Sequence, residues 1–162
     1  MPPEDTHEKL ITLLDERGAD YRVIEHPPEG ATKAVSRLRG HDPRHAAKCI
    51  IVMIKTAEKE RRYAAAVLPG DKRVDFDRMK SLFQGVYAGF APREVAECLA
   101  GTPVGTIPPF SFHEELELIA DPEVFEFPEV FFNAPRLDRT IALPSTDYRA
   151  IAEPRIEPIA RD

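Results

Sequence analysis

The chain has 162 residues, of which 43% are hydrophobic, and it carries a formal net charge of -6. This length and apolar content are typical of one globular domain that buries its core without metal or disulfide staples, so we expect a single domain over residues 1–162. The excess of acid disfavours DNA as a partner, and no stretch approaches the roughly 18 consecutive apolar residues of a membrane span. Because the N-terminus also lacks the features of a signal peptide, we expect a cytoplasmic protein without a membrane partner.

The first quarter of the chain predicts a helix, a strand and a second helix. Regularly spaced leucine and isoleucine give residues 5–17 a helical stripe, and Gly18 suits the left-handed cap that ends a helix. Residues 21–25 alternate as a short strand, and the prolines and glycine of residues 27–30 exclude regular structure. Thr32 is then placed to cap a second helix.

The middle of the chain predicts a β-hairpin, followed by two helices. Residues 47–54 and 63–68 are apolar runs of strand length, and the charged residues 55–62 between them predict an extended loop in solvent. A helix is expected over residues 75–83 and a short strand over residues 86–88. Pro92 then suits the first residue of another helix, which runs to Leu99 and is stopped by Gly101.

The final third alternates β-prone segments with prolines. The expected strands cover residues 116–120, 124–127, 130–133 and 140–143. Ser145 or Thr146 can cap a terminal helix through Ile151, and residues 156–160 can add an edge strand. The fold class is therefore mixed α/β.

Lys48 opens the most apolar stretch of the chain. An unpaired ammonium is expelled from a core, so we expect Lys48 to face a cleft at the mouth of its strand. The alternative is a lysine whose stem lies along the strand end while its charge reaches ordinary solvent. Strand alternation places Cys49 on the opposite face, so we assign this thiol to the core and expect no nucleophile beside the lysine.

A glycine-proline segment, residues 101–109, predicts a stiff loop. Gly105 lacks a Cβ and two prolines close the segment, so the loop can present bare N–H groups to an oxyanion. The alternative is an ordinary proline-rich turn before a strand. One fixed positive charge and a set of peptide donors together suit hydrolysis of an ester on an anionic substrate.

Positive charge is concentrated between residues 33 and 48. This segment holds five basic residues and one acid, a net of +4, which leaves -10 on the rest of the chain. The basic residues that precede Lys48 in it are Lys33, Arg37, Arg39 and Arg44. One basic face would suit a polyanion such as tRNA, and an ordinary solvated helix face is the alternative.

Common catalytic and metal motifs are absent from the sequence. There is no G-x-S-x-G elbow, no phosphate-binding loop and no HExxH helix. His41 and His45 are four residues apart, but Pro43 lies between them in an expected turn, and the two cysteines lack metal spacing. We therefore assign no metal and no cofactor.

Two polar residues are further candidates for the same cleft. Asp71 follows the second strand of the hairpin, where the alternative is a turn residue that closes on its own backbone. Asn133, near the end of the expected strand 130–133, suits binding of a substrate amine or hydroxyl. Its alternative is an asparagine that satisfies nearby backbone groups.

Taken together, these segments resemble the YbaK/prolyl-tRNA-synthetase insertion-domain family of aminoacyl-tRNA deacylases. Lys48 and the pattern Gly105-x-x-x-Pro109 are the most specific matches. The other matching stretches, in the same order along the chain, are residues 21–27, Thr32, 66–71, 132–134 and 141–143. The resemblance implies a single domain with a central mixed, curved β-sheet flanked by helices.

The same resemblance implies hydrolysis of wrongly charged tRNA by water attack, without a covalent intermediate. It implies that Lys48 contacts the 3′ end of the tRNA and that the Gly105 loop positions the ester and the attacking water. Substrate-binding positions that it further implies are Thr32, Asp71, Thr106, Pro109 and Asn133. Residues 134–136 depart from the glycine-rich version common in the family, which affects the expected amino-acid specificity and not the reaction class.

The expected substrate is a small amino acid such as Ala, Cys or Ser on a tRNA, with tRNA-Pro as one candidate. A synthetase pocket rejects smaller or isosteric amino acids poorly, so a second site must hydrolyse the errors. An aminoacyl-tRNA synthetase is a further candidate partner. Two other functions stay open: a non-catalytic module that binds tRNA or a synthetase, and a hydrolase of small aminoacyl esters or thioesters that needs no tRNA.

Overall fold

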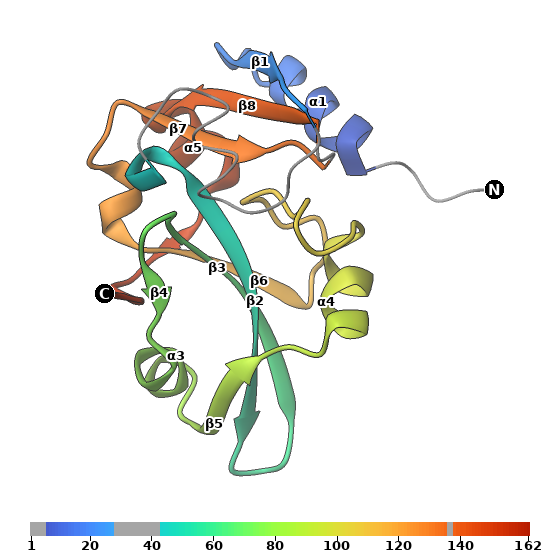
Figure 1. Ribbon diagram of the computed structural model, residues 1–162. Coiled ribbons are helices and arrows are strands. Elements are labelled where there is room, and N and C mark those ends of the chain that lie inside the picture. The colour runs from blue at the N-terminus through green and yellow to red at the C-terminus, as the bar shows by residue number, and fades with distance from the viewer. Residues whose placement is uncertain (1–5, 28–42, 136–137) are drawn as a thin grey trace, which may run out of the picture.

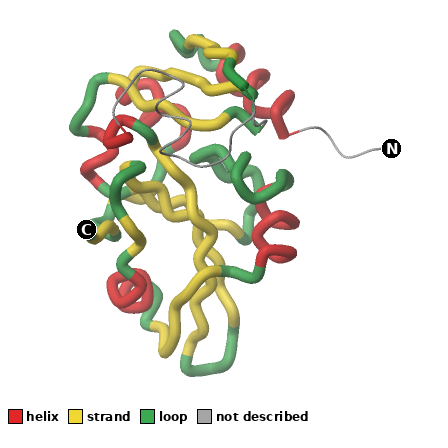
Figure 2. Tube along the Cα trace, in the orientation of Figure 1, coloured by secondary structure: helices red, strands yellow, loops and turns green. Residues whose placement is uncertain are grey.

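The computed structural model describes residues 6–27, 43–135 and 138–162. The α-helices of this part are α1 (Thr6–Glu16), α3 (Phe76–Leu82), α4 (Arg93–Ala100) and α5 (Ser145–Ala152). The strands are β1 (Arg22–Glu25), β2 (Ala47–Thr56), β3 (Arg61–Pro69), β4 (Arg73–Val74), β5 (Gly85–Phe90), β6 (Leu116–Ala120), β7 (Glu129–Asn133), β8 (Arg139–Pro144), β9 (Arg155–Ile156) and β10 (Ala160–Arg161). Two 3-10 helices, η1 (Pro43–His45) and η2 (Pro122–Phe125), complete the order. The helices α1, α3 and α4 lie outside the sheets (Figures 1 and 2).

The largest sheet has five strands in the order β5-β2-β3-β6-β9. The hairpin strands β2 and β3 are antiparallel, as are β2 and β5, whereas β6 runs parallel to β3 and β9 parallel to β6. This sheet is therefore mixed. The expected mixed α/β class is confirmed.

A second sheet meets the first at the beginning of β2. It contains the antiparallel strands β1-β8-β7, and a parallel bridge between Ala46 and Phe131 links β7 to the residue that precedes β2 (Figure 1). The short strands β4 and β10 form a separate antiparallel pair. The start of β2, where Lys48 lies, is thus placed at the junction of two sheets.

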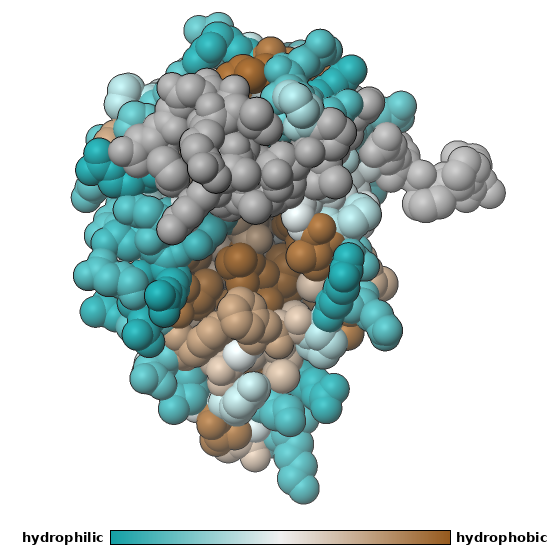
Figure 3. Space-filling view, viewed as in Figure 1, coloured by the Kyte–Doolittle hydropathy of each residue, from teal (hydrophilic) through white to brown (hydrophobic). Residues whose placement is uncertain are grey.

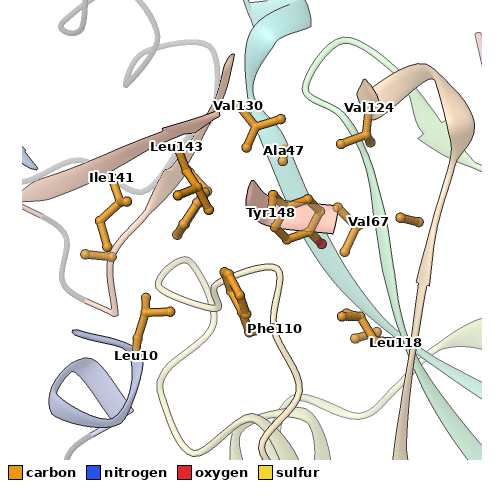
Figure 4. Close-up of a cluster of buried hydrophobic side chains, with 14 of the residues drawn as sticks. Leu10, Ala47, Val67, Phe110, Leu118, Val124, Val130, Ile141, Leu143 and Tyr148 are labelled. Carbon is orange, nitrogen blue, oxygen red and sulfur yellow. The ribbon is translucent and has the colours of Figure 1, made fainter. Parts of the chain in front are cut away.

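Both faces of the β2-β3 hairpin are buried, which divides the core into two clusters. Ala65 and Val67 of β3 belong to the larger cluster, whereas Ala66 and Leu68 belong to the smaller one. Strands buried on both faces read as continuous apolar runs, which explains the composition of residues 64–68. Side chains from other elements fill the larger cluster, among them Leu10, Phe110, Leu118, Val130 and Tyr148 (Figure 4).

The two expected glycine stops are confirmed, and one helix begins at a cap that was not expected. Gly18 follows α1 with a φ of 66°, and Gly101 ends α4 in the left-handed region with a φ of 73°. Asp75 caps α3, because its carboxylate accepts from the N–H groups of Asp77 and Arg78 at 3.1 and 3.2 Å. Gly18 and Gly101 therefore mark the ends of α1 and α4 as their local sequence predicts.

Two expectations were wrong, one about the hairpin loop and one about a strand over residues 124–127. Residues 55–62 do not form an extended loop, since Lys55 pairs with Arg61 and only residues 57–60 connect the strands. Residues 124–127 do not form a strand. Pro122 begins the 3-10 helix η2 there, and the side chain of Asp121 accepts from the N–H of Glu123 at 2.9 Å.

The C-terminal expectations also need correction. Neither Ser145 nor Thr146 caps α5, whose N-cap is Pro144, and the hydroxyl of Ser145 instead donates to the carbonyl of Phe127. The expected edge strand 156–160 is split between β9 and β10, which pair with different partners. Asp121 produces this split, because its second carboxylate oxygen accepts from the N–H groups of Ile159 and Ala160 at 2.9 and 2.8 Å.

No helix within residues 6–27, 43–135 and 138–162 is long and apolar enough to cross a membrane. The expected helix that begins at Thr32 lies outside the described residues.

Candidate functional site

A cavity of about 420 Å³ lies beside the start of β2. Its size falls within the range of small-molecule sites, roughly 300–1,000 Å³. Hydrophobic residues gather in a hollow on the face of the molecule shown in Figure 3. The cavity walls come from residues 46–51, the end of β5, the first half of α4, the loop after α4 and residues 131–133 of β7.

The cavity borders an edge of β2 that its neighbours leave uncovered. Strand β5 pairs with β2 only between Val52 and Thr56, and β7 meets this end of the chain in a bridge at Ala46. Along residues 47–51, the described strands therefore cover β2 on the β3 side alone. A short gap between β5 and β7 remains, and the cavity lies against it.

The hydrogen-bond register shows which peptide groups face this gap. Gly70 N–H donates to the carbonyl of Ala46 at 2.9 Å on the β3 side, whereas Ala91 N–H donates to the carbonyl of Ile51 at 3.0 Å on the β5 side. Peptide groups alternate in direction along an antiparallel strand. The peptide groups of Cys49 therefore face the gap.

Lys48 lines the cavity and is partly exposed, as expected for a lysine at a strand mouth. Its ammonium donates to the carbonyl of Gly70 at 3.4 Å, a long contact from the neighbouring strand end. The backbone of Lys48 is paired opposite Leu68 in β3. The strand thus fixes the root of the side chain.

The loop of residues 101–109 forms another wall, through Val104, Gly105 and Ile107. Gly105 lines the cavity with a φ of 96°, a left-handed conformation that favours glycine. Thr106 is buried, and its hydroxyl and its N–H both donate to the carbonyl of Pro103, at 2.6 and 3.0 Å. The hydroxyl oxygens of Thr102 and Thr106 lie 2.5 Å apart. The loop is a compact turn, closed by its own threonines.

Side chains from four other elements hold this loop. Thr6 of α1 donates to the carbonyl of Gly101 at 2.5 Å, and Asn133 of β7 donates its amide N–H to the carbonyl of Gly105 at 2.8 Å. The remaining two bonds are from Val104 N–H to the Glu97 carboxylate of α4, at 2.7 Å, and from the Tyr148 hydroxyl of α5 to the carbonyl of Pro109, also at 2.7 Å. Sequence reasoning missed Thr6, Glu97 and Tyr148 as supports of the loop.

The peptide donors of the loop differ in whether the protein already uses them. The N–H groups of Val104 and Thr106 already donate to protein acceptors. Within the described chain, the N–H of Gly105 has no acceptor, and Gly105 lines the cavity. This N–H is available to a bound group.

The remaining candidate residues lie away from the cavity walls or outside the described chain. Asp71 is exposed in the turn after β3, and Pro109 is buried with its carbonyl on Tyr148. Arg44 is exposed in η1, with its guanidinium 6.0 Å from the ring centroid of Phe127. The other candidates, Thr32, Lys33, Arg37 and Arg39, lie outside the described residues.

Cys49 packs against the larger core cluster, as expected, but it also lines the cavity beside Lys48 and is partly exposed. Burial raises the pKa of its thiol to about 12, so the thiol is protonated near neutral pH and the reactive thiolate is absent. Among the described residues, no three His, Cys, Asp or Glu side chains gather as a metal would require. The polar groups that the cavity offers are thus the Lys48 ammonium, the Arg93 guanidinium, the Asn133 amide and peptide N–H donors.

Comparisons with known proteins agree with this geometry. Residues 26–151 match the family model of the aminoacyl-tRNA editing domain. A curated relative from Escherichia coli (strain K12), named multifunctional Ser/Thr-tRNA deacylase ProXp-y, is 41% identical over 153 residues, which cover 93% of this chain and 90% of the relative.

Solved structures share the fold at lower identity. A hypothetical protein superposes with a TM-score of 0.83 at 21% identity, covering 94% of this chain and 99% of its own. A protein described as a candidate trans-editing enzyme for prolyl tRNA synthetase superposes with a TM-score of 0.80 at 17% identity, covering 100% of this chain and 99% of its own. These matches confirm the fold, and the family model and the relative confirm the expected reaction class, deacylation of aminoacyl-tRNA. The chain belongs to the aminoacyl-tRNA editing domain family.

Proposed function

We propose that this chain removes serine or threonine from wrongly charged tRNA, with the aminoacylated 3′ end bound in the cavity beside β2. The observation that carries the proposal is that Lys48 of β2 and Gly105 of the loop after α4 line one cavity. A cation and a peptide donor without a protein acceptor are the two groups that an ester on a nucleotide requires. The whole chain, residues 1–162, acts as one domain in this proposal, and its place is the cytoplasm.

The Gly105 N–H serves as the oxyanion donor in the proposed reaction. Water adds to the ester carbonyl carbon, and the N–H stabilises the negative charge that develops on the carbonyl oxygen. The bond between the carbonyl carbon and the ribose oxygen then breaks, the ribose oxygen takes a proton, and the free amino acid and the tRNA leave. One such donor is worth about 3 kcal/mol of barrier. In this proposal the ribose 2′-OH helps to activate the water. A tRNA that ends in 2′-deoxyadenosine should therefore be hydrolysed more slowly.

Lys48 and Asn133 have different roles in this mechanism. Lys48 binds the terminal nucleotide through its charge, because a partly desolvated ammonium pairs strongly with a phosphate. Asn133 holds the carbonyl of Gly105 at 2.8 Å and so positions the neighbouring N–H. Thr106 keeps the loop compact through Pro103. Asp71 and Pro109 lie outside the cavity walls, so any part that they have is indirect.

The relative supports the choice of amino acid. The 41% identical protein is named for Ser- and Thr-tRNA, and both amino acids are small enough for the second sieve that editing requires. The segment that contains Lys33, Arg37, Arg39 and Arg44 would contact the acceptor stem, which predicts binding that weakens as salt rises. We further propose that an aminoacyl-tRNA synthetase presents the tRNA to this protein, and that tRNA-Pro is one such tRNA.

A deacylation screen tests the proposal. Purified protein is mixed with a panel of tRNAs charged with Ser, Thr, Ala, Cys or Pro, and release of the amino acid is measured. We expect rapid release of Ser or Thr from non-cognate tRNA and little from the cognate pairs. Absence of release across the whole panel would favour the non-catalytic module, and equal activity on aminoacyl esters without tRNA would favour the small-ester hydrolase.

A further inference from the structure

Phe90 is exposed at the mouth of the cavity. It is the last residue of β5 and lines the cavity, yet 69% of its surface is accessible. Val104, an apolar residue of the loop that also lines the cavity, is 48% exposed. Residues deeper in the same cavity, such as Ala96 and Phe132, are almost fully buried. The cavity thus has a closed apolar interior and an open aromatic rim.

The ring of Phe90 is held in place although it is exposed. Its backbone pairs with Val52 of β2, and its ring meets that of Phe76 in α3 at a centroid distance of 5.0 Å and an interplanar angle of 80°. Phe76 itself packs against the smaller core cluster. A ring fixed from two sides loses little freedom when a flat ligand stacks on it.

Two cations share the cavity with this ring. Lys48 lines it from β2, and Arg93 lines it from α4 with its side chain 75% exposed and its Nε 3.5 Å from the Glu97 carboxylate. Positive charge along a groove together with an exposed aromatic face is the composition that binds unpaired nucleotides, whose phosphates meet the cations and whose bases stack. The rim therefore fits a nucleotide better than an apolar protein segment.

Resting on the function proposed above, we propose that Phe90 is the stacking platform for the terminal base of the tRNA 3′ end. The ester is attached to the ribose of that nucleotide, so when the carbonyl lies at Gly105 the base must stay outside the closed interior, at the rim. The last nucleotides of a tRNA are unpaired, and their bases have faces free for an aromatic side chain. Phe90 would then set the depth to which the aminoacyl group enters.

The first test measures binding without hydrolysis. The probe is an uncharged RNA hairpin with an unpaired CCA end, whose terminal adenine is replaced by 2-aminopurine. We expect wild type and Phe90→Tyr to quench its fluorescence, and Phe90→Leu to bind at least about fivefold more weakly with reduced quenching, given the usual cost of losing one base stack. The matched control is Tyr87→Leu, which removes an exposed aromatic from the same strand away from the cavity walls and should leave binding unchanged.

The second test measures deacylation and separates this inference from the proposed function. An abasic terminal nucleotide should lower wild-type kcat/KM by at least about fivefold and should lower Phe90→Leu no further, because ring and base act as a pair. Independent losses from the two changes, or a Phe90→Leu variant with wild-type binding and rate, overturn the inference while deacylation stands. Absence of all deacylation overturns the proposed function, and the binding test still decides the role of Phe90.

Discussion

The two walls of the cavity are built in different ways. The loop wall, residues 101–109, is held by single hydrogen bonds from the side chains of Thr6, Glu97, Asn133 and Tyr148. The strand wall, residues 46–51, is held by backbone pairing of β2 with β3. One wall depends on individual side chains, and the other depends on a ladder that no single side chain maintains.

Because of this difference, substitutions on the two walls report on different things, namely contact with the substrate and placement of the peptide donor. A side chain on the strand wall can be replaced while the wall keeps its shape, so its loss reports directly on contact with the substrate. A side chain that supports the loop wall contacts protein, so its loss moves the peptide donor and acts on the reaction indirectly. The predictions below use this contrast, in order of decreasing effect.

Lys48→Ala is expected to have the largest effect. Truncating one partner of a desolvated charged contact costs roughly 2 kcal/mol or more, which predicts a fall in kcat/KM of at least about 30-fold. Because the ladder of β2 is unchanged, the thermal midpoint should stay within about 2 °C of wild type. Lys48→Arg keeps the charge and should recover part of the rate. A wild-type rate in Lys48→Ala would remove this residue from the site.

Two substitutions of Asn133 test whether its hydrogen bond positions the loop wall. Asn133→Ala removes the donor to the carbonyl of Gly105, and a roughly tenfold loss of kcat is expected, which corresponds to about 1.4 kcal/mol, near the upper end of a typical hydrogen-bond contribution. Asn133→Asp places an acceptor against the same carbonyl oxygen and should lose more. If both variants change KM relative to wild type and leave kcat unchanged, Asn133 binds substrate directly and is not a positioning residue.

Glu97 provides a second test of positioning with a conservative control. Glu97→Ala leaves Val104 N–H without its acceptor, and we expect a loss of about five- to tenfold in kcat with KM nearly unchanged. Glu97→Gln keeps a carbonyl oxygen at that place and should restore most of the rate. Equal loss in both variants would mean that the negative charge matters, through Arg93 or the substrate.

Cys49 is expected to show almost no effect on activity. Iodoacetamide at neutral pH should label the exposed Cys98 and not Cys49, and deacylation should continue, because the pKa of the Cys49 thiol is raised by burial to about 12. Mass spectrometry of the labelled peptides and a parallel rate measurement check this. Labelling of Cys49 at neutral pH would contradict a thiol that burial keeps protonated.

The same thiol predicts a dependence of stability on pH. Burial raises the pKa of this thiol in the folded protein above its ordinary value of 9.0. Between pH 9 and about 12 the thiol therefore ionises in the unfolded chain and stays protonated in the folded protein. Its contribution to the free energy of unfolding is complete below pH 9 and is lost as the pH rises toward 12. The free energy of unfolding should therefore fall more steeply above pH 9 in wild type than in Cys49→Ala. Denaturant titrations at several pH values measure the two slopes.

Local signals in the sequence predicted most of the fold. Gly18, Gly101 and Asp75 each fix a helix end through their own backbone or side chain, so no distant contact is needed to place them. The segment 124–127 was misassigned because its β-prone residues follow Asp121, whose carboxylate holds η2 and the distant N–H of Ile159 at once. That second bond spans 38 residues and leaves no local pattern.

The candidate site was predicted only in part for the same reason. Lys48 and Gly105 carry local signals, since a cation in an apolar run and a glycine near prolines are unusual residues in their settings. The side chains that support the loop have no local signal of that role, because their partners are distant in sequence. Tyr148 donates to Pro109 across 39 residues, and Asn133 donates to Gly105 across 28. The cavity itself depends on where β5 stops pairing with β2, which only the packed sheet determines.

The edge of β2 that no described strand covers also bears on aggregation. Open strand edges invite other chains to add to a sheet, and proteins usually guard them with charges, bulges or covering segments. Here β5 pairs with β2 from Val52 onward and the bridge at Ala46 closes the other end, so the open length is confined to residues 47–51. A gap that short can admit a small ligand but gives an invading strand few peptide groups to pair with, so a ligand site on a strand edge need not also be a site of strand addition.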